Sequence, residues 1–127
     1  MDTQKKPVVV AVDDSQTIIA IFEATFEDCD IEFKGYCSTS AASPYLIDNT
    51  PDLLILDIMM PEQDGLSFLN ELRQMPRHKE TPVVILTSKD YHQDRVDSKA
   101  LNAVDFLIKP MSPKDLRKMV RKHLVLK

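Results

Sequence analysis

The sequence predicts an α/β domain, a doubly wound parallel sheet of five strands with helices on both faces. Two observations indicate this fold. Five short apolar runs recur along the chain, and segments long enough to form helices alternate with them. Parallel strands need long right-handed crossovers, which are usually helical. The 127 residues are enough for one such domain with its own hydrophobic core.

The first half of the chain supplies the less regular elements. Residues 7–12 read PVVVAV, a β-branched run that favours a strand. Ser15 can cap the helix that follows, which extends to about residue 28. Residues 31–36 alternate in polarity and indicate a strand at an edge of the sheet. A helix is predicted over 38–49, where Pro44 must lie in the first turn or end the helix early.

The second half begins with the clearest strand. Residues 52–57 run without alternation through four apolar side chains into Asp57, which is typical of a strand that is buried on both faces. The elements that follow are a helix with an apolar residue every third position (Leu66, Leu69, Leu72, Met75), a strand over 82–87, a mostly polar helix over 90–99, a strand over 103–108 and a helix over 112–123. Pro113 suits the first position of that last helix.

The composition excludes several classes of protein. Gly35 and Gly65 are the only glycines, so neither a Walker A loop nor a GxGxxG fingerprint exists. A net charge of −4 argues weakly against nucleic-acid binding by the whole surface. No apolar run approaches the ~20 residues that cross a bilayer. Residues 1–7 carry no pattern of a secretory signal, so we expect a cytoplasmic protein without membrane contact.

The cysteines and histidines indicate no metal site. Cys29 and Cys37 are eight positions apart without a CxxC motif, and we expect two buried, reduced thiols. His78, His92 and His123 are isolated in the sequence, and we expect all three at the surface.

Polar residues follow four of the predicted strands: Asp13 with Asp14, Asp57, Thr87 and Lys109. Ligands of open α/β sheets bind at the carboxyl ends of the strands. Taken singly, each residue has an ordinary explanation, such as a helix cap for Asp14. If the strand order brings them together, three carboxylates would repel one another without a cation. Oxygen ligands favour a hard cation such as Mg²⁺ over zinc.

These residue types point to phosphoryl transfer. A carboxylate can act as a nucleophile and form an aspartyl phosphate. Asp57 is the best candidate nucleophile because it stands alone at the end of the central strand, whereas Asp13 and Asp14 are better placed to hold a metal. The ammonium of Lys109 and the hydroxyl of Thr87 can each contact an oxygen of the transferred group.

Four motifs carry a resemblance to a known family: VDDS at 12–15, LDIMMPEQDG at 56–65, ILTS at 85–88 and FLIKP at 106–110. They resemble the receiver domain of two-component response regulators, the chemotaxis type most closely. The resemblance covers essentially the whole chain and implies a flavodoxin-like (βα)5 fold with strand order 2-1-3-4-5. It also implies a single receiver domain over 1–127, with its core at about 7–124 and no output domain.

The resemblance implies a chemical role for each residue of the acidic group. Asp57 would be the phosphoacceptor, phosphorylated by a sensor histidine kinase or a histidine phosphotransfer protein. Asp14 and Asp57 would bind Mg²⁺ or Mn²⁺ directly. Asp13 would act through a water molecule, and Met59 would contribute its backbone carbonyl.

The resemblance also implies a switch. Thr87 would be the switch hydroxyl that moves toward the phosphoryl group, and Phe106 the aromatic switch that follows it. Lys109 would bind the phosphoryl group, and the Lys109–Pro110 peptide bond would be cis. Three positions depart from the family pattern: Ser88 stands where alanine is common, Asn102 where a glycine is usual, and Phe106 lacks the hydroxyl that a tyrosine would have there. Asn102 can replace that glycine because asparagine adopts the left-handed conformation more readily than most residues.

Phosphorylation is expected to alter the face formed by the helix at 90–99, the strand at 103–108 and the helix at 112–123. This face would bind a downstream protein or promote dimerisation of an otherwise monomeric protein. The last helix carries a basic stripe: Lys114, Arg117, Lys118, Arg121 and Lys122. A solvated helix face explains the stripe, and docking of an acidic partner is the alternative. We expect no direct DNA binding.

Other interpretations remain open at this point. An aspartyl-nucleophile phosphatase would need a second acid two residues after Asp57, where this chain has Met59. We therefore expect a phosphoryl-accepting switch and not an enzyme that turns over external phosphoesters. A flavodoxin-like nucleotide binder is disfavoured because the loop after the first strand is acidic. The chain could also be a receiver excised from a longer multidomain regulator.

Overall fold

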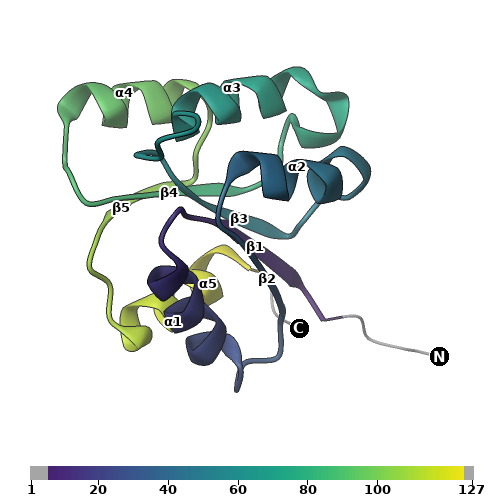
Figure 1. Cartoon of the computed structure of the whole chain (residues 1–127), viewed down its shortest axis with the longest axis vertical. Coiled ribbons are helices and arrows are strands. Elements are labelled where there is room, and N and C mark those ends of the chain that lie inside the picture. The colour runs from purple at the N-terminus through teal and green to yellow at the C-terminus, as the bar shows by residue number, and fades with distance from the viewer. Residues whose placement is uncertain (1–5, 125–127) are drawn as a thin grey trace.

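The computed structural model describes residues 6–124 (Figure 1). Its strands are β1 (Val8–Val12), β2 (Glu32–Tyr36), β3 (Leu53–Asp57), β4 (Val83–Thr87) and β5 (Asp105–Ile108). Its helices are α1 (Gln16–Phe26), α2 (Thr39–Asp48), α3 (Gly65–Gln74), the 3-10 turn η1 (Pro76–His78), α4 (His92–Ala100) and α5 (Pro113–His123). All strand pairs are parallel, and the sheet order is β2-β1-β3-β4-β5. The predicted fold and strand order are confirmed.

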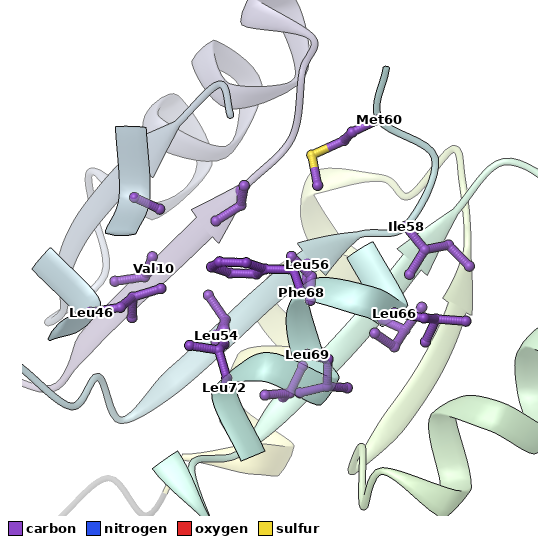
Figure 2. Packing of buried hydrophobic residues seen from close by; sticks show 14 residues of the cluster. Val10, Leu46, Leu54, Leu56, Ile58, Met60, Leu66, Phe68, Leu69 and Leu72 are labelled. Carbon is purple, nitrogen blue, oxygen red and sulfur yellow. The ribbon is translucent and has the colours of Figure 1, made fainter. Parts of the chain in front are cut away.

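Helices cover both faces of the sheet (Figure 1). α2, α3 and α4 lie on one face, and α1 and α5 lie on the other. Strand residues alternate between two cores: Val10, Leu54 and Ile85 pack with α2 and α3, whereas Val9, Ile55 and Leu86 pack with α1 and α5. Both sides of a central strand are therefore buried, which explains the continuous apolar runs in the sequence. Figure 2 shows how Phe68 and Leu72 of α3 meet Leu54 of β3 and Leu46 of α2.

Side-chain caps mark where four of the helices begin. At α2 the hydroxyl of Ser38 accepts from the backbone N–H of Ala41. The hydroxyl of Ser15 accepts a hydrogen bond from the backbone N–H of Ile18 at α1. Ser112 caps α5 in the same way, and Pro113 occupies its first position as predicted. Such caps satisfy backbone donors that have no partner within the helix. At α3 the cap is Asp64, in the loop that follows β3.

The position of Pro44 differs from the prediction. The residue lies in the sixth position of α2, neither in the first turn nor at an early end. Proline cannot donate the helical hydrogen bond to the residue four positions earlier, which is Ser40. Ser40 is exposed, so water can satisfy its carbonyl oxygen. This is the physical reason that the helix tolerates an internal proline here.

His78 is buried, which contradicts the prediction of a surface histidine. Its exposed fraction is 0%. Nε2 lies 2.6 Å from the carbonyl oxygen of Leu46, and Nδ1 lies 2.9 Å from the hydroxyl oxygen of Thr81. A carbonyl oxygen can only accept, so Nε2 is the donor in that contact. The ring therefore connects α2 to the loop before β4.

The burial predicted for the other two histidines and the two cysteines is only partly confirmed. His123 is half-buried, with Nε2 2.9 Å from a carboxylate oxygen of Asp105, so the surface prediction is wrong for it too. His92 is exposed, as predicted. Cys29 and Cys37 are free thiols as predicted, but both are only half-buried.

The turn between α4 and β5 contains a left-handed residue. Asn102 has a φ of 61°, as expected for the asparagine that stands in place of a glycine. Its backbone N–H donates to the carbonyl of Lys99, and that of Ala103 donates to Ser98, which closes the end of α4. Among residues 6–124, no helix is both long and apolar enough to cross a membrane.

Candidate functional site

The strand order places the predicted acids together. Asp13 follows β1 and Asp57 ends β3, and these two strands are neighbours in the sheet. Asp14 lies beside them at the start of the loop to α1. One carboxylate oxygen from each of the three residues lies within 4.8 Å of the others. Asp13 and Asp57 are buried, with exposed fractions of 2% and 3%, whereas Asp14 is exposed.

Asp57 is held in an environment that opposes its charge. The backbone N–H of Met59 donates to its Oδ1 at 3.1 Å. Burial raises the pKa of Asp57 from its usual 3.8 to about 6. The Met59 hydrogen bond and the charge of Lys109 lower the pKa, whereas the charges of Asp13 and Asp14 raise it. Desolvation is the largest of these effects, so Asp57 carries a charge that its surroundings stabilise only in part.

Asp13 has two carboxylate oxygens with different partners. Oδ1 accepts from the backbone N–H of Ser15 at 2.9 Å. Oδ2 is buried without a hydrogen bond of good geometry, although the ammonium of Lys109 lies 2.7 Å from it. The same ammonium lies 3.6 Å from Oδ2 of Asp57. We regard the Lys109 contact as a charge pair, because a buried carboxylate oxygen without any cationic neighbour would be costly.

Thr87 and Lys109 come from the neighbouring strand ends. Thr87 ends β4 and is fully buried, and its hydroxyl accepts from the backbone N–H of Lys89 at 3.3 Å. In that contact the hydroxyl is the acceptor and keeps its own proton for donation. The backbone N–H of Lys109 donates to the carbonyl of Thr87 at 2.8 Å, which joins the two strand ends. The peptide bond between Lys109 and Pro110 is cis.

Gly65 shapes the loop behind Asp57. A Cβ at this position would collide with the backbone carbonyl oxygen of Asp57 and would lie 2.6 Å from the Cα of Ile58. The N–H of Gly65 donates to the carbonyl of Ile58 at 3.1 Å. The first residue of α3 therefore packs directly on the backbone of the buried aspartate, which only glycine permits.

The acidic cluster suits a hard cation. Its donors are carboxylate oxygens of Asp13, Asp14 and Asp57, without histidine or cysteine in the group. The buried Oδ2 of Asp13 has the ammonium of Lys109 beside it but no hydrogen bond of good geometry, so a cation or a water molecule on a cation could share this oxygen. Oxygen-only donor sets bind Mg²⁺ and similar ions. The residues present thus fit a divalent metal at this edge of the sheet.

Phe106 lies apart from the acidic cluster. Its half-buried side chain packs against the core on the α2 and α3 side of the sheet. The guanidinium of Arg95 on α4 lies over its ring, with the guanidinium carbon 4.7 Å from the ring centroid. Sequence reasoning did not identify Arg95. No sequence signal links residues 95 and 106, because their contact depends on how α4 packs beside β5.

Comparisons with known proteins all point to one family. The response regulator receiver domain family matches residues 9–121. Response regulator Rre1 of Synechocystis is 35% identical over 117 residues, which cover 91% of this chain and 51% of that protein. The transcriptional regulatory protein SrrA of Staphylococcus aureus is 30% identical over 85% of this chain and 44% of its own length. The chain thus spans about half, or less, of these curated relatives.

Two solved structures match this chain over almost their entire length. The chemotaxis protein CheY4 of Vibrio cholerae superimposes with a TM-score of 0.87 at 28% sequence identity. The match covers 94% of this chain and 99% of that one. A putative response regulator from Chloroflexus aurantiacus gives a TM-score of 0.85, also at 28% identity, over 96% of this chain and all of that one.

Proposed function

Because the chain belongs to the response regulator receiver domain family of two-component systems, we propose that it is a phosphoryl-accepting switch whose acceptor is Asp57. One observation carries the proposal: a buried aspartate at the end of the central strand lies beside two further acids and a lysine ammonium. A purely structural aspartate would not be buried beside like charges, because that arrangement is unfavourable.

The chain's own residues account for the transfer. A carboxylate oxygen of Asp57 attacks phosphorus of a phosphohistidine, on a sensor histidine kinase or a histidine phosphotransfer protein. An oxygen–phosphorus bond forms and the phosphorus–nitrogen bond breaks. The electron pair stays on the imidazole nitrogen of the donor, which then takes up a proton. Lys109 and the hydroxyl of Thr87 each bind an oxygen of the transferred group, which lowers the barrier by positioning and charge.

Asp14, Asp57 and the backbone carbonyl of Met59 would hold Mg²⁺ or Mn²⁺, and Asp13 would do so through a water molecule. The bound cation would offset the negative charge of the acids and of the incoming phosphoryl group. Asp13 keeps Lys109 close to the site, since its Oδ2 is the nearer partner of the ammonium. The ammonium of Lys109 therefore lies next to Asp57 even when no phosphoryl group is bound.

The conformational change would be transmitted from Thr87 to Phe106. Drawing the Thr87 hydroxyl toward a phosphoryl oxygen changes the space next to Phe106 on the adjacent strand β5. That change would alter the face formed by α4, β5 and α5, where a downstream protein binds or a second copy pairs. The basic residues of α5 are part of this face, but net charge argues against direct DNA binding. The proposed kinase partner and the free thiols fit a cytoplasmic protein.

In this proposal the protein accepts a phosphoryl group on its own aspartate and does not turn over external phosphoesters. Met59, two residues after Asp57, offers no acid to protonate a leaving group. We therefore expect slow loss of the phosphoryl group and no rapid hydrolysis of external phosphoesters.

The test uses a small phosphodonor. The protein is incubated with Mg²⁺ and acetyl phosphate, and intact mass spectrometry should find one phosphoryl group that hydroxylamine removes, as an acyl phosphate requires. Asp57→Asn should remain unmodified, and Asp52→Asn, which changes an exposed acid just before β3, should be modified as the wild type is. Equal modification of Asp57→Asn would disprove the assignment. Continuous release of phosphate over many turnovers per minute would favour the phosphatase instead.

A further inference from the structure

Arg95 makes two contacts at once. Its guanidinium lies over the face of the Phe106 ring, 4.7 Å from the ring centroid. Its Nε and Nη2 donate to the two carboxylate oxygens of Asp90, the latter at 3.0 Å. Such a two-point contact fixes the plane of the guanidinium, which a lysine ammonium cannot reproduce. The hydrogen bonds from Arg95 hold the pKa of Asp90 below its usual value, so the pair is charged at neutral pH.

Asp90 lies in the loop between β4 and α4, three residues after Thr87. The same loop contains Lys89, whose backbone N–H donates to the Thr87 hydroxyl. The hydroxyl proposed to move toward a phosphoryl group is therefore connected to the anchor of Arg95 by a short stretch of backbone. A displacement of Thr87 would thus act on Asp90 through this backbone, and a shift of Asp90 would act on the guanidinium over Phe106.

The ring of Phe106 has no polar group of its own. A phenylalanine cannot be held by a hydrogen bond, so its conformation depends on packing and on the charge above its face. The ring is half-buried, and the side chains of the core contact it from the sheet side. A guanidinium at this distance attracts the electron-rich face of an aromatic ring. Arg95 thus provides the directional contact that Phe106 itself cannot make.

We propose that Arg95 is a positioning residue that holds Phe106 in the conformation seen here, with Asp90 aligning its guanidinium, until movement of the Thr87 loop releases the ring. This inference rests on the proposed function, because it names how the same switch is held in its unphosphorylated state. By thermodynamic linkage, if binding of a phosphoryl group favours release of the Phe106 ring, then release of the ring must favour binding of a phosphoryl group. A substitution that frees the ring lowers the cost of the activated conformation, so it increases affinity for a phosphoryl group at Asp57.

The first measurement needs no phosphoryl group. Aromatic NMR of the protein labelled on its five phenylalanines, without Mg²⁺ or phosphodonor, reports the side-chain conformation of Phe106, whose signals are assigned with Phe106→Leu. Arg95→Ala should redistribute its rotamers, and Asp90→Ala should do so to a smaller extent. Arg95→Lys should give an intermediate result, because the charge remains but the two-point contact with Asp90 is lost. Lys99→Ala removes an exposed positive charge from the same helix and should leave the ring unchanged.

The second measurement is the affinity for beryllofluoride, an analogue of the phosphoryl group, in the presence of Mg²⁺. Arg95→Ala should bind it about two- to fivefold more tightly than the wild type, the change expected from losing one exposed cation–π contact. Lys99→Ala should match the wild type. A generally destabilised α4 would weaken binding, so tighter binding distinguishes positioning from a merely structural role.

The outcomes separate the two proposals. If Arg95→Ala leaves the rotamers of Phe106 unchanged, Arg95 does not position the ring and the inference is wrong. If the ring is freed but affinity for beryllofluoride does not rise, the inferred link to the switch is wrong. If the wild type and all variants fail to bind beryllofluoride, the proposed function fails, and the rotamer measurement alone decides whether Arg95 positions Phe106.

Discussion

The ammonium of Lys109 lies 2.7 Å from Oδ2 of Asp13 and 3.6 Å from Oδ2 of Asp57. The side chain of Lys109 is mostly covered, and that of Asp13 is almost fully buried. The lysine therefore offsets the charge of an acid that has no other cationic neighbour among residues 6–124. We therefore expect Lys109 to contribute to the stability of the fold, in addition to its proposed role in binding a phosphoryl group.

Lys109→Met should destabilise the protein in the absence of metal. Removal of the ammonium leaves the buried carboxylate of Asp13 with the backbone N–H of Ser15 but without a cation, and we expect a loss of about 2–3 kcal/mol in the free energy of unfolding. Urea unfolding in EDTA measures it. Lys118→Met, at an exposed site on α5, is the control and should change little. Addition of Mg²⁺ should recover part of the loss, and equal stability of both variants in EDTA would contradict the prediction.

Asp57 should make stability depend on pH. Its pKa in the folded protein is about 6, against 3.8 ordinarily, so between these values the folded state binds more protons than the unfolded state. The free energy of unfolding contributed by this group therefore falls as pH rises from about 4 to about 6. Asp57→Asn removes the effect and should be more stable than the wild type at pH 7 by about 1–2 kcal/mol, after allowance for solvent screening.

The measurement is urea unfolding of both proteins in EDTA at several pH values. The advantage of Asp57→Asn should shrink toward pH 4, where the wild-type carboxyl is protonated in the folded state and is becoming protonated in the unfolded state as well. An advantage that stays constant from pH 4 to pH 7 would show that the raised pKa of Asp57 is not its cause.

A divalent cation should stabilise the folded protein through the acidic cluster. Mg²⁺ at ten times its dissociation constant should add about 1.4 kcal/mol to the free energy of unfolding. Asp14→Asn should weaken the effect, since Asp14 brings one of the three clustered carboxylates. Asp28→Asn, an exposed acid near the end of α1, should not. Thermal unfolding with and without Mg²⁺ tests this, and equal stabilisation of both variants would place the metal elsewhere.

Gly65→Ala should damage both stability and phosphorylation. The new methyl group would collide with the backbone of Asp57 and Ile58, and this backbone cannot yield without moving the Asp57 carboxylate. We expect a loss of about 1–3 kcal/mol and slower labelling by acetyl phosphate. Gly35→Ala is the comparison, because its Cβ would meet side-chain atoms of Ile19 on α1 and Phe33 on β2 and would not contact the backbone of Asp57. It should therefore leave labelling unchanged even if it lowers stability. Labelling at the wild-type rate in Gly65→Ala would refute the prediction.

His78→Ala should destabilise the fold without affecting the acceptor chemistry. The substitution opens a cavity and removes a hydrogen bond from each of two buried partners, Leu46 and Thr81. We expect a loss of about 2–4 kcal/mol, whereas His92→Ala at an exposed site should be nearly neutral. Chemical unfolding measures the loss of stability, and labelling by acetyl phosphate measures whether phosphorylation is unchanged. A neutral His78→Ala variant would show that the buried ring is not structurally required.

The order of the elements, the parallel sheet and the acids at its carboxyl edge could all be predicted from the amino-acid sequence. The reason is that these features depend on local pattern: buried strands read as apolar runs, and Asp13, Asp57, Thr87 and Lys109 each follow a strand directly. Once the order of strands is given, their ends must meet at one edge. The left-handed turn at Asn102 was likewise predictable, because it depends on the conformational preference of one residue.

The contacts between side chains of different elements could not be predicted from the sequence and are known from the three-dimensional structure. His78 is buried because the carbonyl of Leu46, 32 positions away, comes to its ring. Pro44 is tolerated because the carbonyl that it leaves without a donor belongs to an exposed residue. Arg95 reaches Phe106 because α4 packs beside β5. Each of these contacts depends on the relative placement of segments distant in the chain, and hydrophobic periodicity specifies the buried face of a helix but not the polar partners that meet at its edges.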